Sequence, residues 1–216
     1  MASKWKKQLP EKANYLFYRN ELRSVPDDAL IEEILADWYY DYQKLESRHG
    51  FIQWIFPELN RQGSNPYSTA LTKEEAKLIR EDLECAKRVI RAYRMMLNFY
   101  GIVLVDEATG ELARNEEIFR ERFDNLLKHS HNENRIRRII RSLGQMGFAR
   151  YRKPLVDFFE DQILKKGELK KCKYSLDNEW KKALEVNSKE YIQDTTETAE
   201  DRTDSVFFAH IASTSP

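Results

Sequence analysis

The feature that most constrains this chain is a long amphipathic segment between Thr72 and Gly101. Its apolar residues recur at about 100° per residue, the spacing of one helix face. The central stripe consists of Ile79, Leu83, Ala86, Ile90, Tyr93 and Leu97. Four more residues widen it to well over a third of the circumference: Leu78, Val89, Met96 and Tyr100. A helix with so wide an apolar face must contact more than one neighbour, so we expect it to be the central helix.

Both ends of this helix carry recognisable signals. The TKEE sequence at 72–75 matches a capping box, in which Thr72 and Glu75 each bond to the other's backbone N–H. Gly101 is placed to end the helix. The segment that follows, residues 102–110, is consistent with either a β-hairpin or an ordered loop.

A second helix is predicted closer to the N-terminus. Pro26 and the acidic pair at 27–28 form a start signal, because carboxylates are favoured at a helix N-terminus. One apolar stripe follows: Ile31, Ile34, Leu35, Trp38, Tyr42 and Leu45. We therefore expect a single helix that ends at His49 and Gly50, with Tyr40 exposed on its opposite side. For the short apolar run at 51–56 we favour a buried helical turn, and for 57–71 a loop.

The remaining helices are predicted with the same signals. Asn115 opens a helix that buries Ile118, Phe119, Phe123, Leu126 and Leu127. After a polar corner at 129–132, the next helix buries Ile136, Ile139, Ile140 and Leu143, and it ends at Gly144. Pro154 fits the first turn of a helix that carries Leu155, Val156, Phe158, Phe159, Ile163 and Leu164. Ser175 is placed to cap a last helix with Leu176, Trp180 and Leu184.

The composition agrees with this pattern. Only seven Gly and six Pro occur in 216 residues, which favours helices joined by short loops. We expect an all-α fold, a single compact multi-helix domain at 14–186 around the central helix. A flexible N-terminus at 1–13 and a disordered polar tail at 187–216 would flank it.

The cysteines and the N-terminus bear on the cellular compartment. Cys85 and Cys172 form no disulfide framework, so we expect two free thiols in a reducing compartment. The N-terminus lacks an apolar signal core, and no run approaches the roughly 18 apolar residues of a membrane span. We therefore expect a cytosolic or nuclear protein that is not secreted and whose membrane contact would be peripheral.

The sequence contains no recognisable catalytic or cofactor motif. Nucleophile elbows and phosphate-binding glycine loops are absent from it, so we expect neither an enzyme nor a cofactor. His129 and His131 would point in different directions on a helix, although a loop could bring them together. Since no cysteine pair or zinc-binding histidine motif supports them, we expect capping and hydrogen bonding there and no metal.

Basic residues offer one binding hypothesis. Thirty-six basic and 36 acidic residues cancel, which argues against a chain that coats nucleic acid, although a local basic stripe remains compatible. On the predicted helix after 132, four arginines fall outside the apolar face: Arg135, Arg137, Arg138 and Arg141. They form either a solvated face paired with acidic residues or a dock for an acidic protein or nucleic acid.

An ordered series of motifs indicates a family. FYRNE at 17–21, IEEIL at 31–35 and IQWIFP at 52–57 come first. RAY at 91–93 and LNFYGI at 97–102 follow, and then SHN at 130–132, SLG at 142–144 and PLV at 154–156. In this order and spacing, the chain from about 14 to about 164 closely resembles the conserved N-terminal region of the opioid growth factor receptor family.

This resemblance implies an all-α domain that binds opioid growth factor, the pentapeptide Met-enkephalin, and restrains cell proliferation. It also implies a nuclear or perinuclear location with peripheral membrane association. The long repeat-bearing C-terminal region of some members has no counterpart in this sequence.

Two hypotheses follow, a non-enzymatic peptide-binding domain and a helical scaffold that binds an acidic partner through the arginines. The candidate contact residues are the polar groups at motif positions and on the arginine face: Arg19, Asn20, Gln53, His131, Asn132, Arg135, Arg138 and Arg141. Gln53 and Asn132 have an alternative structural role, because amides beside buried aromatic rings commonly satisfy backbone groups. An unrecognised enzyme would need a polar-lined cleft beside residues 129–135.

Overall fold

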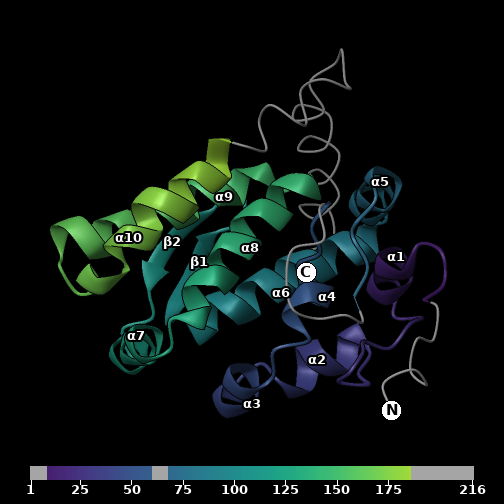
Figure 1. Ribbon diagram of the computed structural model, residues 1–216, viewed down its shortest axis with the longest axis horizontal. Coiled ribbons are helices and arrows are strands. Elements are labelled where there is room, and N and C mark those ends of the chain that lie inside the picture. Colours follow the sequence, from purple (N-terminus) through teal and green to yellow (C-terminus); the bar gives the residue numbers. More distant parts are fainter. Residues whose placement is uncertain (1–8, 60–67, 186–216) are drawn as a thin grey trace, which may run out of the picture.

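The computed structural model describes residues 9–59 and 68–185 as a helical domain with one small hairpin (Figure 1). Its first elements are α1 (Ala13–Tyr18), α2 (Ile31–Asp37), α3 (Tyr42–Ser47), α4 (Ile52–Ile55), α5 (Lys73–Glu81) and α6 (Leu83–Phe99). The strands β1 (Ile102–Asp106) and β2 (Glu111–Arg114) come next, followed by α7 (Phe119–Lys128), α8 (His131–Gln145), α9 (Arg152–Glu160) and α10 (Lys173–Ser175). The predicted fold class is confirmed. The expectations for residues 1–8 and 186–216, and for most of the loop at 57–71, lie outside the described residues.

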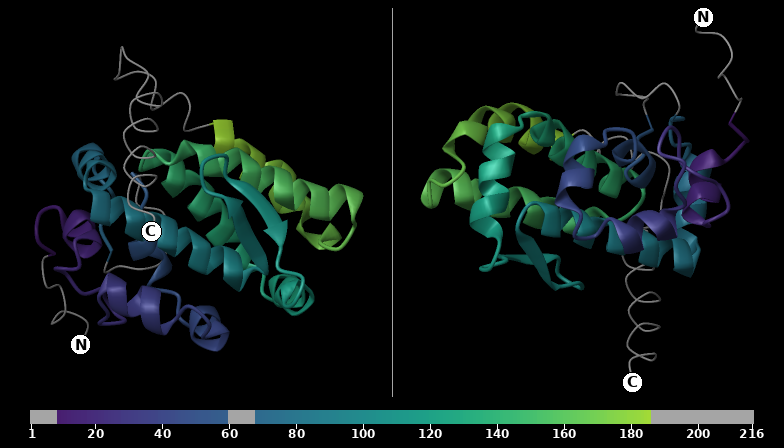
Figure 2. Two further views of the ribbon diagram at one scale, coloured as in Figure 1. Left: turned by 180° about the vertical axis from the view of Figure 1, so that it is seen from behind. Right: turned by 90° about the horizontal axis from the view of Figure 1, so that it is seen from below.

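Helix α6 is the hub of the domain, as the width of its apolar face predicted. It contacts α1, α2, α5 and β1, and most of its side chains are buried. Figure 1 shows α6 passing through the middle of the molecule, between the layer of α8, α9 and α10 and the elements α1 to α4. In Figure 2 the hairpin lies on the face turned away from the viewer of Figure 1.

The predicted central helix is in fact two helices, and this is a correction. The chain bends at Asp82, whose carboxylate accepts hydrogen bonds from the backbone N–H groups of Glu84 and Cys85 at 3.0 and 3.1 Å. Asp82 therefore ends α5 and caps α6. The capping box at the start of α5 is confirmed, because Thr72 and Glu75 each bond to the other's backbone N–H.

The single helix expected across 26–49 is also wrong. Helix α2 begins at Ile31, where the Glu33 carboxylate accepts from the Leu30 N–H at 3.0 Å. Asp41 caps the separate helix α3. The apolar stripe nevertheless packs as predicted because Trp38 and Leu45 are buried, and Tyr40 is 74% exposed as expected.

An arginine clamp fastens α2 to α6. Glu32 on α2 accepts from Arg88 Nε at 2.7 Å and from Arg91 at 2.8 and 2.9 Å. Burial opposes ionisation of Glu32, but the hydrogen bonds from the two arginines hold its pKa below the usual value. The clamp is partly exposed, since Glu32 and Arg91 retain 35% and 46% of their side-chain accessibility.

Of the two alternatives for the segment after Gly101, a β-hairpin or an ordered loop, the structure has the hairpin. Gly101 has φ of +75°, and a Cβ there would lie 2.6 Å from Phe119 Cα, so glycine is required. β1 and β2 pair antiparallel, with Ile102 opposite Arg114. The buried helical turn favoured for 51–56 is confirmed as α4.

Several C-terminal boundaries differ from the predictions. Helix α7 begins at Phe119 because Asn115 first forms a turn, in which its side chain accepts from the Glu117 N–H. Helix α8 continues one residue past Gly144. The last helical segment covers residues 173–185 and begins with α10. Ser175 lies inside this segment and donates to Glu133, so it does not cap the helix. Leu164, expected in the core, is 50% exposed.

Gly144 has a packing role instead of ending α8. A Cβ there would meet Arg152 Nε at 2.8 Å. Arg152 occupies this space because it donates to the Ile140 carbonyl at 3.0 Å and to the Ala183 carbonyl at 2.6 Å. This one guanidinium therefore joins α8, α9 and the last helical segment.

The two cysteines are free, as expected, and both are buried. Burial raises the pKa of each thiol to about 12, so both are neutral at physiological pH. Within residues 9–59 and 68–185, no helix has the length and apolar character needed to cross a membrane.

Candidate functional site

The candidate residues near the N-terminus do not gather into one site. Arg19 is exposed and pairs with neighbouring carboxylates. Asn20 has φ of +65°, and its side chain accepts from the Glu32 N–H at 3.1 Å, so it holds the start of α2. Gln53 is buried and accepts from the Ser68 hydroxyl at 2.9 Å. Asn20 and Gln53 therefore each bond to another part of the chain. For Gln53, this agrees with the structural role considered as the alternative.

The other candidates lie on α8, and all of them except His131 share one polar face, which we call the α8 polar seam. It consists of Asn132, Arg135, Arg138, Arg141, Ser142 and Gln145. These side chains bind an irregular stretch of the chain, residues 45–59, which contains the end of α3, all of α4 and the segments beside them. The seam supplies hydrogen bonds that this stretch cannot make within its own short helices.

Arg135 satisfies the C-terminal end of α3. It donates to the backbone carbonyls of Leu45 at 2.9 Å and Arg48 at 2.7 Å, and it lies 3.3 Å from that of Glu46. The residue is only 4% exposed, and burial lowers the pKa of its guanidinium. Arg135 therefore fits neither alternative considered for the α8 arginines, a solvated face or a dock for an acidic partner, because the chain itself covers it.

Arg138 and Arg141 clamp a buried carboxylate. Each approaches Glu58 at 3.0 Å, and Glu58 is 3% exposed. Burial raises the pKa of Glu58 despite the two arginines. Such an ion pair is costly to break, because removal of one partner leaves buried charge without compensation.

Two further bonds complete the seam. Ser142 donates to the Pro57 carbonyl at 2.7 Å, and Gln145 accepts from the Leu59 N–H at 2.8 Å. Arg137 lies off the seam and pairs at 3.4 Å with Glu179, which is partly exposed. The internal role of the seam was not predicted from the sequence, because a polar helix face does not reveal whether water or another part of the chain covers it.

At its N-terminal end, the seam meets a corner that contains His131, Asn132 and Glu46. One carboxylate oxygen of Glu46, Oε2, accepts from Asn125 at 2.5 Å and from Asn132 at 3.1 Å. The other, Oε1, lies 2.6 Å from His131 Nε2. Burial opposes ionisation of Glu46, but the two amide hydrogen bonds hold its pKa below the usual value. Burial and the charge of Arg135 lower the pKa of His131.

An open groove lies elsewhere, between β2 and α9, and has a volume of about 550 Å³. Its lining consists of Glu111, Leu112, Ala113, Arg114, Glu116, Pro154, Asp157, Phe158, Asp161, Gln162 and Lys166. Four carboxylates and two cations surround a small apolar floor. The volume falls in the range of pockets that bind small ligands.

None of these residues was among the candidates predicted from the sequence. A signal was nevertheless present, because Asp157 and Asp161 lie four apart on the outer face of a helix that follows a possible hairpin. The groove lining contains no histidine, cysteine, serine or lysine–nucleophile pair. It offers instead four carboxylates, an arginine, a lysine and apolar side chains.

The described part of the chain is thus a helical domain with an internally bonded polar seam and an open charged groove. Residues 7–200 match the model of a family described as the opioid growth factor receptor (OGFr) conserved region. The chain belongs to this family, as the ordered motifs indicated.

Curated relatives agree with this assignment. The opioid growth factor receptor of Rattus norvegicus is 43% identical over 162 residues, which cover 75% of this chain and 28% of the relative. That of Homo sapiens is 43% identical over 156 residues, 72% of this chain and 23% of the relative. Opioid growth factor receptor-like protein 1 of Mus musculus is 41% identical over 163 residues, 76% of this chain and 34% of the relative.

The matched region thus spans from 23% to 34% of the length of these relatives. No solved structure matches the chain.

Proposed function

We propose that this chain is a non-enzymatic, receptor-like domain that binds a short opioid peptide, Met-enkephalin, in the groove between β2 and α9. Membership of a family whose curated members are named receptors carries the proposal. Within this proposal the domain acts in growth regulation, in the nucleus or the perinuclear cytoplasm, with peripheral membrane association.

The chemistry of the groove supports this placement. A free pentapeptide has an ammonium group at one end and a carboxylate at the other. Glu116 and Asp157 supply carboxylates for the ammonium, Lys166 supplies a cation for the carboxylate, and Leu112 and Phe158 supply apolar contact. All five residues line the same groove.

The strand at the groove adds a second kind of contact. The sheet has two strands, so β2 has a strand partner on one edge only. An extended peptide can form backbone hydrogen bonds along such an edge, and side-chain pockets beside it then provide specificity. In the proposed complex, the peptide lies along β2 with an apolar side chain against Phe158.

Calorimetry with the full chain tests the proposal. Met-enkephalin should bind with one-to-one stoichiometry, and the N-acetylated peptide should bind about tenfold more weakly because it lacks the ammonium charge. A scrambled peptide of the same composition is the control for non-specific heat. Absence of heat at high micromolar Met-enkephalin would rule out the peptide-receptor role.

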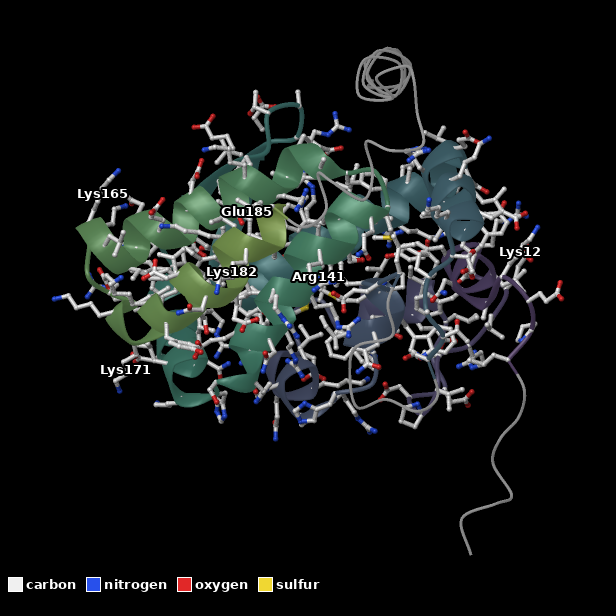
Figure 3. All side chains as sticks on the ribbon, turned by 45° about the horizontal axis from the view of Figure 1, so that its top comes forward. Lys12, Arg141, Lys165, Lys171, Lys182 and Glu185 are labelled. Carbon is white, nitrogen blue, oxygen red and sulfur yellow. The ribbon has the colours of Figure 1, made fainter. Side chains whose placement is uncertain are left out.

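An alternative is a scaffold that binds an acidic protein or nucleic acid. The α8 arginines give it little support because the seam engages Arg135, Arg138 and Arg141 internally. The observation that favours it is a lysine-rich end: residues 165–173 contain five lysines and one glutamate. Figure 3 shows Lys165 and Lys171 projecting outward at one end of the molecule, far from Lys12 at the other.

A titration with fluorescent single-stranded oligonucleotide at two salt concentrations tests this alternative. Binding through the lysines should weaken steeply as salt increases, because bound counterions are released from phosphates. Replacement of Lys170 and Lys171 by Gln should reduce the salt dependence. A signal that is absent or insensitive to salt would count against the scaffold.

A further inference from the structure

Three of the four histidines in the chain gather at one corner of the fold. His129 follows the last residue of α7, His131 is the first residue of α8, and His49 lies two residues beyond α3. The ring centroids of His131 and His49 are 4.9 Å apart, and those of His131 and His129 are 5.9 Å apart. The sequence favoured divergent histidines, but the chain turns between α7 and α8 and brings the rings together.

A carboxylate completes the cluster. Glu46, His129 and His131 each contribute one potential ligand atom, and these three atoms lie within 4.8 Å of one another. They come from three separate parts of the chain: the end of α3, the turn after α7 and the start of α8. In a tetrahedral zinc site with bonds of about 2.0–2.2 Å, ligand atoms are about 3.3 Å apart. Small rotations of the exposed His129 and the half-buried His131 produce this spacing.

The contact between Glu46 and His131 is a second observation. Glu46 Oε1 and His131 Nε2 are 2.6 Å apart, a close carboxylate–imidazole contact, and neither atom is accessible to solvent. A carboxylate oxygen and an imidazole nitrogen are both ligands that zinc accepts. The exposed His129 adds a third potential ligand atom to this contact.

We propose that Glu46, His129 and His131 form a binding site for Zn²⁺ or a similar divalent transition metal. One carboxylate and two imidazoles are an established zinc-binding combination, and they leave a fourth position for water or for His49. Asn125 and Asn132 hold Glu46 Oε2, which leaves Oε1 available to the metal. Such outer hydrogen bonds orient ligands and raise metal affinity. Arg135 fixes the backbone that carries Glu46 by binding the carbonyls of Leu45 and Arg48.

The site would fasten α3 to the junction of α7 and α8. It shares no residue with the groove between β2 and α9. Zinc binding and peptide binding are therefore independent, and failure of either leaves the other unaffected.

Calorimetry with ZnCl₂ on the full chain, stripped of metal with a chelator, tests the site. The wild type should bind one equivalent, and His129→Ala and His131→Ala should each weaken binding by at least tenfold. His210→Ala, which removes the remaining histidine, is the matched control and should bind like the wild type. Circular dichroism should show that each variant is folded, and because His129 is exposed its variant keeps the test interpretable.

Co²⁺ provides an independent readout, because its visible absorption reports the number and geometry of its ligands. The wild type should give the intense spectrum of four-coordinate Co²⁺, and His129→Ala should lose it. The proposal is overturned if the wild type binds no Zn²⁺, if both histidine variants bind it normally, or if His210→Ala abolishes binding.

Discussion

Two arginine clamps in this molecule share a sequence pattern but differ in their surroundings. Arg88 and Arg91 on α6 hold Glu32, and Arg138 and Arg141 on α8 hold Glu58. The local sequences are RVIR and RIIR, so both pairs stand three apart on one helix face. Glu32 keeps 35% of its side-chain accessibility, whereas Glu58 keeps 2%. This sequence pattern therefore specifies an arginine pair but not the solvent exposure that determines the energetic role of the pair.

The largest difference should appear when one arginine of each clamp is removed. Arg141→Met should reduce the free energy of unfolding by about 3–5 kcal/mol, because it takes one of the two guanidinium groups away from the buried Glu58 carboxylate. Arg91→Met is the matched control at the exposed clamp, and its cost should stay below about 1 kcal/mol. Urea unfolding followed by tryptophan fluorescence measures both. Equal costs would show that burial does not distinguish the clamps.

A second test compares two arginines of α8. Arg135→Met should cost about 2–3 kcal/mol, because it leaves the carbonyls of Leu45 and Arg48 without donors in the interior. Arg137→Met removes the same charge from the same helix but only a partly exposed pair with Glu179, and it should cost less than about 1 kcal/mol. Urea midpoints of the two variants provide the comparison, and a similar shift in both would contradict the internal role of the seam.

The pH dependence of the clamps should have opposite signs. The pKa of Glu32 lies below the unfolded value, so its contribution is complete above about pH 4.5 and is lost as the pH falls through the folded pKa. The pKa of Glu58 lies above the unfolded value, so its ionisation opposes folding as the pH rises from about 4.5.

Urea unfolding between pH 3 and pH 6, a range chosen around the glutamate pKa of about 4.3, separates these effects. Glu32→Gln should flatten the loss of stability in acid by less than about 0.5 kcal/mol, since water screens this clamp. An unchanged acid profile in the variant would show that Glu32 is not held in its ionised form.

A substitution in the groove between β2 and α9 should have the smallest effect on the free energy of unfolding. Asp157→Asn should change the free energy of unfolding by no more than about 0.5 kcal/mol, because Asp157 is exposed and its ion pair with Lys153 is open to solvent. The same change should weaken Met-enkephalin binding several-fold in calorimetry. Asp124→Asn, at an exposed position on α7, should leave both quantities unchanged. Loss of binding in this control would place the peptide elsewhere.

Local signals in the sequence predicted much of the fold. The capping box of Thr72 and Glu75, the close of α6 at Gly101 and the exposure of Tyr40 all depend on neighbouring residues, and all are confirmed. The breaks at Asp82 and after Asp37 were missed because the apolar stripes stay in phase across them. A stripe reports which side chains face the core, and two helices joined by a cap can keep that face continuous.

The candidate sites were less predictable, because they depend on what packs against each polar face. Arg135 and Arg138 bind carbonyls more than 80 positions away in the chain, and no local pattern reveals such partners. The histidine corner depends on the turn at Ser130, and the groove depends on how the hairpin meets α9. In each case the sequence gives the types of the residues at the site, but it does not predict which other residues surround them in the fold.

The α8 polar seam also determines the order in which the chain can become stable. Its hydrogen bonds to residues 45–59 join positions between 82 and 90 apart in the sequence. During synthesis, those carbonyls remain without their donors until α8 has left the ribosome. A truncated chain that ends before α8 should therefore remain an uncooperative, protease-sensitive ensemble, and folding should wait for long-range closure. The N-terminal half of the domain should therefore depend for its stability on a helix that is synthesised well after it.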